Sequence, residues 1–213
     1  VVCLLVGWAQ VSTAGGAAVV ANSTALADSI IAFAFHRFLG QSKNNTGSAL
    51  IALGGYGRKE LCFSSDLDIM FLHDGPLISD EEDLNVFLVS FLWDIGFEVG
   101  HSVRSLEEAL LLAEKDDIIL NSMLEGRLIA GDPTVFHAFG KQLNARLHAM
   151  GIKDFIRRKK RVRMLNYREY GNEVYHGEPN VKFTAGGLRD YHTGMWIAGA
   201  QFKLRSLQEC HAE

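Results

Sequence analysis

The chain has few prolines, few cysteines and no charged residue before Asp28. Three prolines against 21 glycines exclude a collagen-like protein and indicate long regular elements joined by flexible turns. The cysteines, Cys3, Cys62 and Cys210, are odd in number and far apart, which argues against a disulfide framework and a structural zinc site. They fit a protein of the reducing cytoplasm, which is the location we expect.

No charge of one sign dominates either, since 21 basic and 25 acidic residues leave a net charge of −4. This balance argues against bulk attraction to nucleic acid or to an anionic membrane, so any basic patch must be local. A hydrophobic content of 48% over 213 residues excludes disorder and predicts a folded globular chain.

A long uninterrupted hydrophobic run is also missing at the N-terminus. The apolar stretch Val1–Ala9 is short for a membrane span, and polar residues interrupt the sequence that follows without flanking lysine or arginine. We therefore expect neither a membrane helix nor a signal peptide, and residues 1–21 form a segment of unknown role. Whether the chain, which opens with Val1, is a fragment of a longer protein is left open.

Hydrophobic periodicity and turn signals predict regular elements along the rest of the chain. Helices are expected over 22–39, 79–95, 106–115, 133–150, 152–170 and 188–204, and strands over 49–53, 66–71, 97–104 and 127–130. Ser79 with Glu82 and Ser105 with Glu108 form capping boxes, which mark two of the helix starts. The order predicts an α+β fold, with a sheet domain and flanking helices over 22–140 and a helical region over 141–213.

The stretch that carries chemistry is a glycine turn followed by two aspartates. Gly54 and Gly55 end a buried strand and let backbone N–H groups approach an anion, while Asp66 and Asp68 lie at i and i+2 on the next strand. Two carboxylates so close repel each other unless a cation lies between them, and Mg²⁺ suits a site of carboxylates and phosphates. An edge strand with an acidic solvent face explains Asp-x-Asp by itself equally well.

The glycine turn together with the aspartates resembles the nucleotidyltransferase superfamily of DNA polymerase β. More narrowly, the chain resembles the N-terminal domain of the protein-PII uridylyltransferases, also called uridylyl-removing enzymes. The matching stretches are Gly54-Gly55-Tyr56-Gly57-Arg58, Glu60-Leu61, Ser65-Asp66-Leu67-Asp68, Glu98 to Arg104, Glu178-Pro179-Asn180-Val181-Lys182, Gly186-Gly187-Leu188-Arg189-Asp190 and Trp196-Ile197-Ala198.

The resemblance implies a polymerase β-like fold and a role in nitrogen regulation. The implied reaction moves UMP from UTP to a tyrosine of the PII signalling protein and releases pyrophosphate. Asp66 and Asp68 would be the catalytic residues and would hold Mg²⁺, and Gly54 and Gly55 would cradle the phosphates. Members of the superfamily usually add a third carboxylate, which is missing here near His101. Glu98 is a candidate substitute, whereas His101 is read as a structural residue rather than as a general base.

Four more residues are assigned to nucleotide binding, each beside a plainer interpretation. Arg58 would meet phosphate oxygens or lie in a solvated turn, and Ser65 would bond phosphate or cap the strand entrance. Lys182 and Arg189 would reach the triphosphate, or Arg189 would pair with Asp190 or Glu178 and pin its loop.

The densest charge lies between Arg157 and Arg168, where seven of twelve residues are basic. We expect a solvated helix there, with contact to triphosphate, an acidic protein or nucleic acid as alternatives. Tyr167 is the single aromatic residue in this stretch and makes no stacking platform among these charges, so nucleic acid is disfavoured.

Two other functions are consistent with the same residues. One is a non-catalytic nucleotide-binding regulatory module of the same fold, which the missing third carboxylate favours. The other is a transferase that acts on a small molecule or an RNA end. Uridylyl removal and glutamine sensing are expected to be absent from this chain, and the sequence fixes neither the nucleobase, the acceptor nor the oligomeric state.

Overall fold

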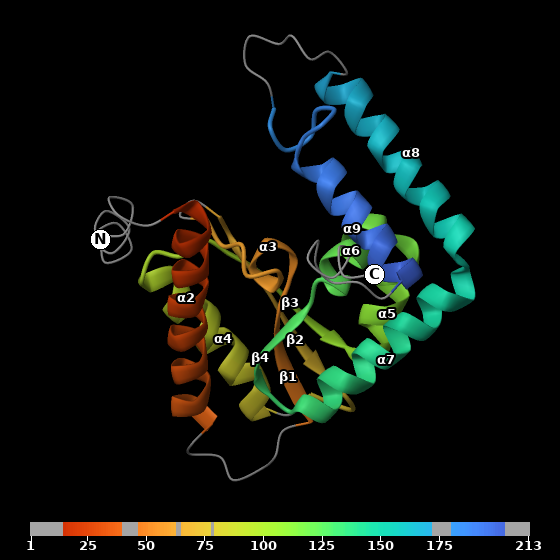
Figure 1. Ribbon diagram of the computed structural model, residues 1–213. Helices are drawn as coiled ribbons and strands as arrows, with labels where there is room; N and C mark the ends of the chain where they lie inside the picture. The colour runs from red at the N-terminus through yellow and green to blue at the C-terminus, as the bar shows by residue number, and fades with distance from the viewer. Residues whose placement is uncertain (1–14, 40–46, 63–64, 78, 172–179, 203–213) are drawn as a thin grey trace. The chain divides into compact units, whose positions relative to one another are not determined.

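The computed structural model describes residues 15–39, 47–62, 65–77, 79–171 and 180–202 (Figure 1). The chain forms two compact units. The first comprises residues 1–113 and 118–140, and the second comprises residues 114–117 and 141–213. Since basic and acidic residues number 6 and 15 in the first unit and 15 and 10 in the second, the first is strongly acidic and the second is basic.

The first unit is built on a four-stranded mixed sheet with the order β3-β2-β1-β4. Its strands are β1 (Ser48–Ala52), β2 (Leu67–His73), β3 (Val99–Ser105) and β4 (Arg127–Gly131). Strand β1 is antiparallel to both β2 and β4, whereas β2 and β3 are parallel. The predicted α+β class is confirmed, and all four predicted strands are present with small shifts at their ends.

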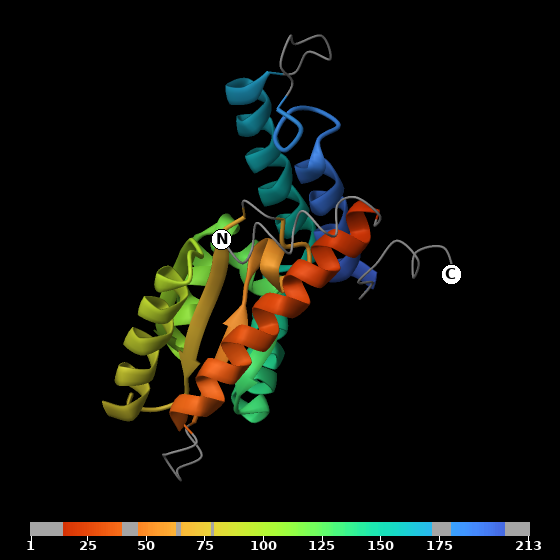
Figure 2. The same ribbon diagram turned by 90° about the vertical axis from the view of Figure 1, so that its left-hand side faces the viewer.

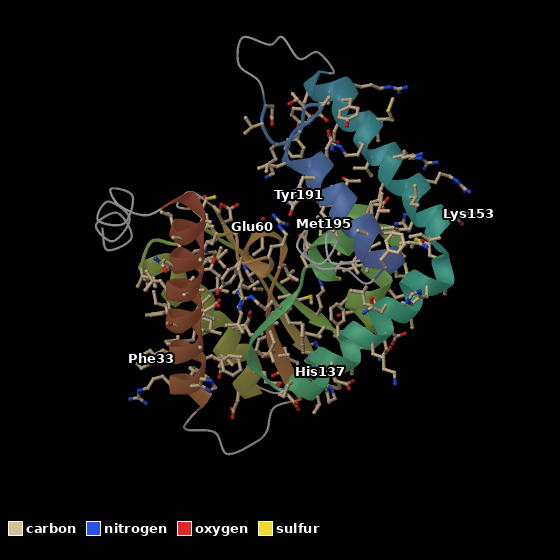
Figure 3. The ribbon with its side chains drawn as sticks, viewed as in Figure 1. Phe33, Glu60, His137, Lys153, Tyr191 and Met195 are labelled. Carbon is tan, nitrogen blue, oxygen red and sulfur yellow. The ribbon has the colours of Figure 1, made fainter. Side chains whose placement is uncertain are left out.

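One face of the sheet is covered by helices α2 (Gly16–Leu39) and α4 (Ser79–Asp94) (Figure 1). Figure 2 shows α2 running obliquely across the strands. The core on this face joins residues of both helices to alternate residues of the strands, among them Ile31, Phe35, Leu50, Ile69, Phe71, Leu84 and Leu88. Phe33, on the outer side of α2, is 69% exposed (Figure 3).

Helices α5 (Leu106–Lys115) and α6 (Asp117–Leu124) lie on the other side of the sheet (Figure 1). Met70 and Leu72 are buried along with Ile69 and Phe71, so β2 is buried on both faces after Asp68. In the sequence, the alternation of Leu67, Ile69 and Phe71 with Asp66, Asp68 and Met70 predicts a strand with one buried face, and that prediction is wrong beyond Asp68. The reason is that β2 is an inner strand of a sheet covered on both sides.

Helix α2 matches a membrane span by length and composition between Gly16 and Phe38. Its side chains nevertheless take part in the core, because Ala27, Ile31 and Phe35 are all buried. Asp28, in the middle of the helix, forms an ion pair with Arg127 of β4, with 2.9 Å between Oδ2 and Nη1. These are features of a helix that packs one face against a sheet and leaves the other exposed.

The second unit contains helices α8 (Ile152–Tyr170) and α9 (Leu188–Phe202), and α7 (Pro133–Met150) runs from the first unit into it. Figure 3 marks Lys153 near the start of α8 and Tyr191 on α9. The predicted boundaries of α7 and α8 are confirmed. Helix α6 was missed, because its eight residues, although preceded by Asp116, are too few for an apolar periodicity to stand out.

The basic run of α8 was expected to be a solvated face. In the structure, part of it is buried. Lys159 is 2% exposed, with its Nζ 4.6 Å from the centroid of the Phe155 ring and 3.5 Å from Oδ1 of Asp117. Arg158 pairs with the same carboxylate, with 2.9 Å between Nε and Oδ1. Since Arg163 is also buried, three of the basic residues hold the helical unit together.

Candidate nucleotidyl-transfer site

The glycine turn forms a single helical turn, α3 (Gly54–Gly57), between β1 and β2. Gly54 has a φ of 54°, a backbone conformation that glycine adopts without strain. A Cβ on Gly57 would overlap the carbonyl oxygen of Glu125, so this position has no room for a side chain. The N–H groups of Gly54 and Gly55 have no acceptor among the described residues, and no side chain caps the turn.

Asp68 lies beside this turn. The Leu53 N–H donates to the Asp68 carbonyl at 2.9 Å, and a Cβ built on Gly54 would be 3.5 Å from Oδ2 of Asp68. Asp66 and Asp68 are both exposed, whereas Leu67 between them is buried. This alternation directs both carboxylates to the solvent side of the chain at the entrance to β2.

A hydrogen-bonded cluster supports the turn from the side of α2. The buried Tyr56 donates its hydroxyl to Oδ1 of Asp28 at 2.7 Å, and Arg127 binds both oxygens of that carboxylate. Arg127 also donates to the Tyr56 carbonyl at 3.3 Å. Burial, followed by the hydrogen bond to Asp28, raises the pKa of Tyr56 far above its ordinary value, so the hydroxyl stays protonated as a donor. Sequence reasoning missed this cluster because its residues are far apart in the chain.

Arg58 is held by two glutamates. Its Nε lies 2.7 Å from Glu60 and its Nη1 lies 2.6 Å from Glu125, so the side chain joins the glycine turn to the end of α6. Nη2 is directed toward Gly55, 3.7 Å from where a Cβ would lie, and makes no hydrogen bond with the described residues. Two of the three guanidinium nitrogens of Arg58 are therefore paired within the protein, and Nη2 is left available to a ligand. The predicted contact of Arg58 with phosphate stays a prediction.

Ser65 is exposed directly before Asp66, and its N–H donates to the Cys62 carbonyl at 3.1 Å. Ser65 thus lies at the entrance to β2, a position consistent with a phosphate contact and with a cap of the strand. The predicted contact of Ser65 with phosphate stays a prediction.

The third carboxylate is missing from the neighbouring strand, as the sequence indicated. Gly100 pairs with Asp68 in the parallel register, and a Cβ there would come within 2.5 Å of Oδ1 of Asp68. Glu98 precedes β3 and is exposed, and its carbonyl accepts the Leu67 N–H at 2.8 Å. In the described part of the chain, no three histidine, cysteine, aspartate or glutamate side chains group closely enough to hold a metal ion. Glu98 therefore does not complete a three-carboxylate cluster.

His101 points to the other face of the sheet. It pairs with Ile69, whose side chain belongs to the core under α2 and α4, and its ring lies 6.2 Å from that of Trp93 in α4. Because neighbouring residues of a strand point to opposite faces, His101 cannot share the face of Asp68. This geometry agrees with the structural role expected for His101.

In the second unit, Asp190 is bound by Arg163, not by Arg189. Nε of Arg163 and the hydroxyl of Tyr167 each lie 2.6 Å from Oδ1, and the Gly186 N–H lies 2.6 Å from Oδ2. Burial alone would raise the pKa of Asp190, but the hydrogen bonds from Tyr167, Gly186 and Arg163 outweigh it and lower that pKa. The network fixes the turn before α9, and the proposed pair between Arg189 and Asp190 is wrong.

Lys182 and Arg189 lie close to aromatic rings. Lys182 is exposed, with Nζ 5.4 Å from the centroid of Phe183, and Arg189 lies 5.8 Å from the same ring and 5.9 Å from that of Trp196. The Asn180 side chain accepts the N–H groups of Lys182 and Phe183 and so shapes this turn. Glu178 lies outside the described residues. The predicted contacts of Lys182 and Arg189 with triphosphate stay predictions.

Comparison with known proteins identifies the family. Residues 154–213 match the family described as GlnD PII-uridylyltransferase. The bifunctional uridylyltransferase/uridylyl-removing enzyme of Haemophilus influenzae strain 86-028NP is 41% identical over 153 residues, which are 71% of this chain and 18% of that enzyme. The enzyme of the same name from Methylococcus capsulatus is 38% identical over 187 residues, which are 87% of this chain and 21% of the relative. The chain belongs to the PII-uridylyltransferase family.

The family assignment confirms the resemblance that the two sequence motifs indicated. The chain spans about a fifth of the length of the curated PII-uridylyltransferase relatives it matches. Residues 3–89, which include the glycine turn and both aspartates, also match the family described as glutamate-ammonia ligase adenylyltransferase. Both matched families are named for nucleotidyl transfer.

Proposed function

We propose that this chain carries the transfer site of a cytoplasmic enzyme that moves UMP from UTP to a tyrosine of the PII signalling protein and releases pyrophosphate. The observation that supports this most directly is the Asp68 carboxylate, which lies beside the Gly54 turn. An anion-binding turn and a carboxylate pair on adjacent strands suit a nucleoside triphosphate with its cation.

In this proposal the glycine turn binds the phosphates and the two aspartates bind the metal ion. The free N–H groups of Gly54 and Gly55, with Nη2 of Arg58 beside them, bind phosphate oxygens. Asp66 and Asp68 would hold Mg²⁺, an ion that suits one or two carboxylates together with substrate phosphates. Bound Mg²⁺ would neutralise negative charge on the triphosphate. The fixed turn and carboxylates orient the α-phosphorus for in-line attack by the acceptor oxygen as pyrophosphate leaves.

The test is transfer of label from each of the four nucleoside triphosphates to purified PII. We expect label from UTP, and we expect Asp68→Asn and Asp66→Asn each to reduce transfer by at least about a thousandfold, since each removes a metal ligand. Asp74→Asn, an exposed aspartate just beyond β2, is the matched control and should transfer normally. Normal labelling by either site variant would disprove the metal assignment.

A second candidate is transfer of AMP from ATP, which the match of residues 3–89 to the adenylyltransferase family favours. The ATP arm of the same assay separates the two reactions. The non-catalytic alternative, which the missing third carboxylate supports, predicts nucleotide binding without transfer from any of the four triphosphates.

A further inference from the structure

Strand β3 is an edge of the sheet that offers free backbone groups. The Leu67 N–H donates to the Glu98 carbonyl, so alternate residues from Glu98 onward direct their backbone groups toward β2. The backbone groups of Val99, His101 and Val103 face the opposite way, and none of these has a partner there among the described residues. Such an edge is a template for one more strand.

This edge lies next to Asp68 because β3 pairs with β2. The way between them is open because Gly100 has no side chain. Gly100 is paired with Asp68, and even a Cβ there would come within 2.5 Å of Oδ1 of Asp68. No side chain of β3 therefore stands between the free edge and Asp68 at this position. A strand added to β3 would lie two strand spacings from β2, about 10 Å. A tyrosine side chain leaning across Gly100 spans the greater part of that separation, and the Asp68 carboxylate, directed toward Gly100, extends from β2 to meet it, whereas serine and threonine are too short.

The other face of the edge has apolar surface for the neighbouring side chains. Trp93 is 55% exposed, and its ring lies edge-on to that of the exposed His101, 6.2 Å away. In an added strand, the residues on either side of a tyrosine that points toward Asp68 point toward this pair of rings. The edge therefore fits an extended segment with a tyrosine flanked by apolar or aromatic residues.

We propose that the acceptor protein binds as an added β-strand along the free edge of β3, with its tyrosine lying across Gly100 toward Asp66 and Asp68. The transfer step itself rests on the function proposed above. The docking mode deepens that function, because it defines the acceptor as an extended, tyrosine-bearing segment selected by backbone pairing and side-chain length.

A peptide N-methylation series tests this mode without changing the protein. A fluorescent ten-residue peptide centred on the target tyrosine of PII is titrated into the full chain, with a single N-methyl group moved along the peptide. Methylation of N–H groups that face β3 should weaken binding by about 10-fold each, since each loses a hydrogen bond and adds a clash. Methylation at the alternate positions should change binding less than about 3-fold.

A matched pair of protein variants supplies the second arm. His101→Pro removes an outward N–H without breaking the ladder to β2, and should weaken peptide binding and UMP transfer to PII by about 10-fold. His101→Ala keeps that N–H and removes only the ring beside Trp93, so it should weaken peptide binding and transfer by less than about 3-fold, clearly less than His101→Pro. UTP binding should be unchanged in both variants, which also verifies that they are folded.

The outcomes separate this inference from the proposed function. No alternation along the peptide, no peptide binding, or native peptide binding by His101→Pro would overturn strand addition, even if UMP transfer to PII is observed. Alternating peptide binding without transfer to PII from any nucleotide would support the docking mode and contradict the proposed function.

Discussion

At the scale of single residues, Lys59 ends the glycine turn in a conformation that suits glycine. Its φ is 64°, and the Lys59 N–H donates to the Tyr56 carbonyl while the Glu60 N–H donates to the Gly55 carbonyl. This is the hydrogen-bond pattern of a Schellman ending, where glycine is usual because a Cβ strains the left-handed backbone.

Lys59→Gly should raise the free energy of unfolding by about 0.5–1 kcal/mol, because relief of backbone strain exceeds the extra entropy of glycine in the unfolded chain. Urea unfolding measures the effect. Lys59→Ala keeps a Cβ at the same φ and is the control. An equal gain in both variants would show that the lysine side chain, and not its backbone, was the source of strain.

Tyr56→Phe tests the cluster beneath the turn. Loss of the hydroxyl that donates to Asp28 should lower the free energy of unfolding by about 1–2 kcal/mol, because the acceptor is an ionised, partly buried carboxylate. Displacement of the turn should also weaken UTP binding, measured by calorimetry. Tyr170→Phe, at an exposed position in α8, should alter neither quantity.

At the scale of elements, the sequence specified most of what is periodic or locally capped. The capping box before α5 is present, since the Ser105 N–H donates to Glu108 at 3.0 Å and the Glu108 N–H donates to Ser105 at 3.3 Å. These contacts lower the pKa of Glu108, chiefly through the backbone N–H of Ser105. Local signals of this kind are readable because both partners lie within one turn of helix.

Ion pairs between residues far apart in the chain could not be predicted from such local signals. No local pattern indicates that Asp28 binds Arg127, that Glu125 binds Arg58, or that Asp190 binds Arg163, because each pair joins distant positions. The burial of Lys159 was also hidden, since a run of basic residues favours a solvated face unless the folded chain supplies partners. The candidate site was found because its turn and its carboxylates lie close together in the sequence.

The Asp190 network predicts a response to acid in the unit that holds α8 and α9. The folded-state pKa of Asp190 lies below its unfolded value of about 3.8, so the unfolded chain takes up the proton first as the pH falls. Stability from this group is complete above about pH 5, where the carboxyl is ionised in both states, and is lost as the pH falls through the unfolded and then the folded pKa. Urea midpoints at pH 5 and pH 3 should differ less for Asp190→Asn than for the native chain; equal differences would contradict the prediction.

At the scale of the whole molecule, the hydrophobicity of α2 raises the question of membrane binding. The helix has the length and composition of a span, yet Asp28 and several apolar residues of α2 are engaged with the sheet domain. Exposing α2 to lipid would break these contacts and remove apolar core surface. We therefore expect the folded chain to stay unbound when floated with zwitterionic vesicles. Flotation of the native chain would contradict this, whereas flotation of Asp28→Leu alone would show that the ion pair retains the helix.

The position of the glycine turn and Asp68 on one antiparallel pair of strands also bears on biosynthesis. Strands β1 and β2 follow each other in the chain, so their pairing closes only a short loop and carries a small entropic penalty. Contacts of this kind form early in folding, and the ribosome releases these residues before those of α8 and α9. The nascent polypeptide can thus assemble the centre of its reactive site while its own C-terminal helices are still being translated.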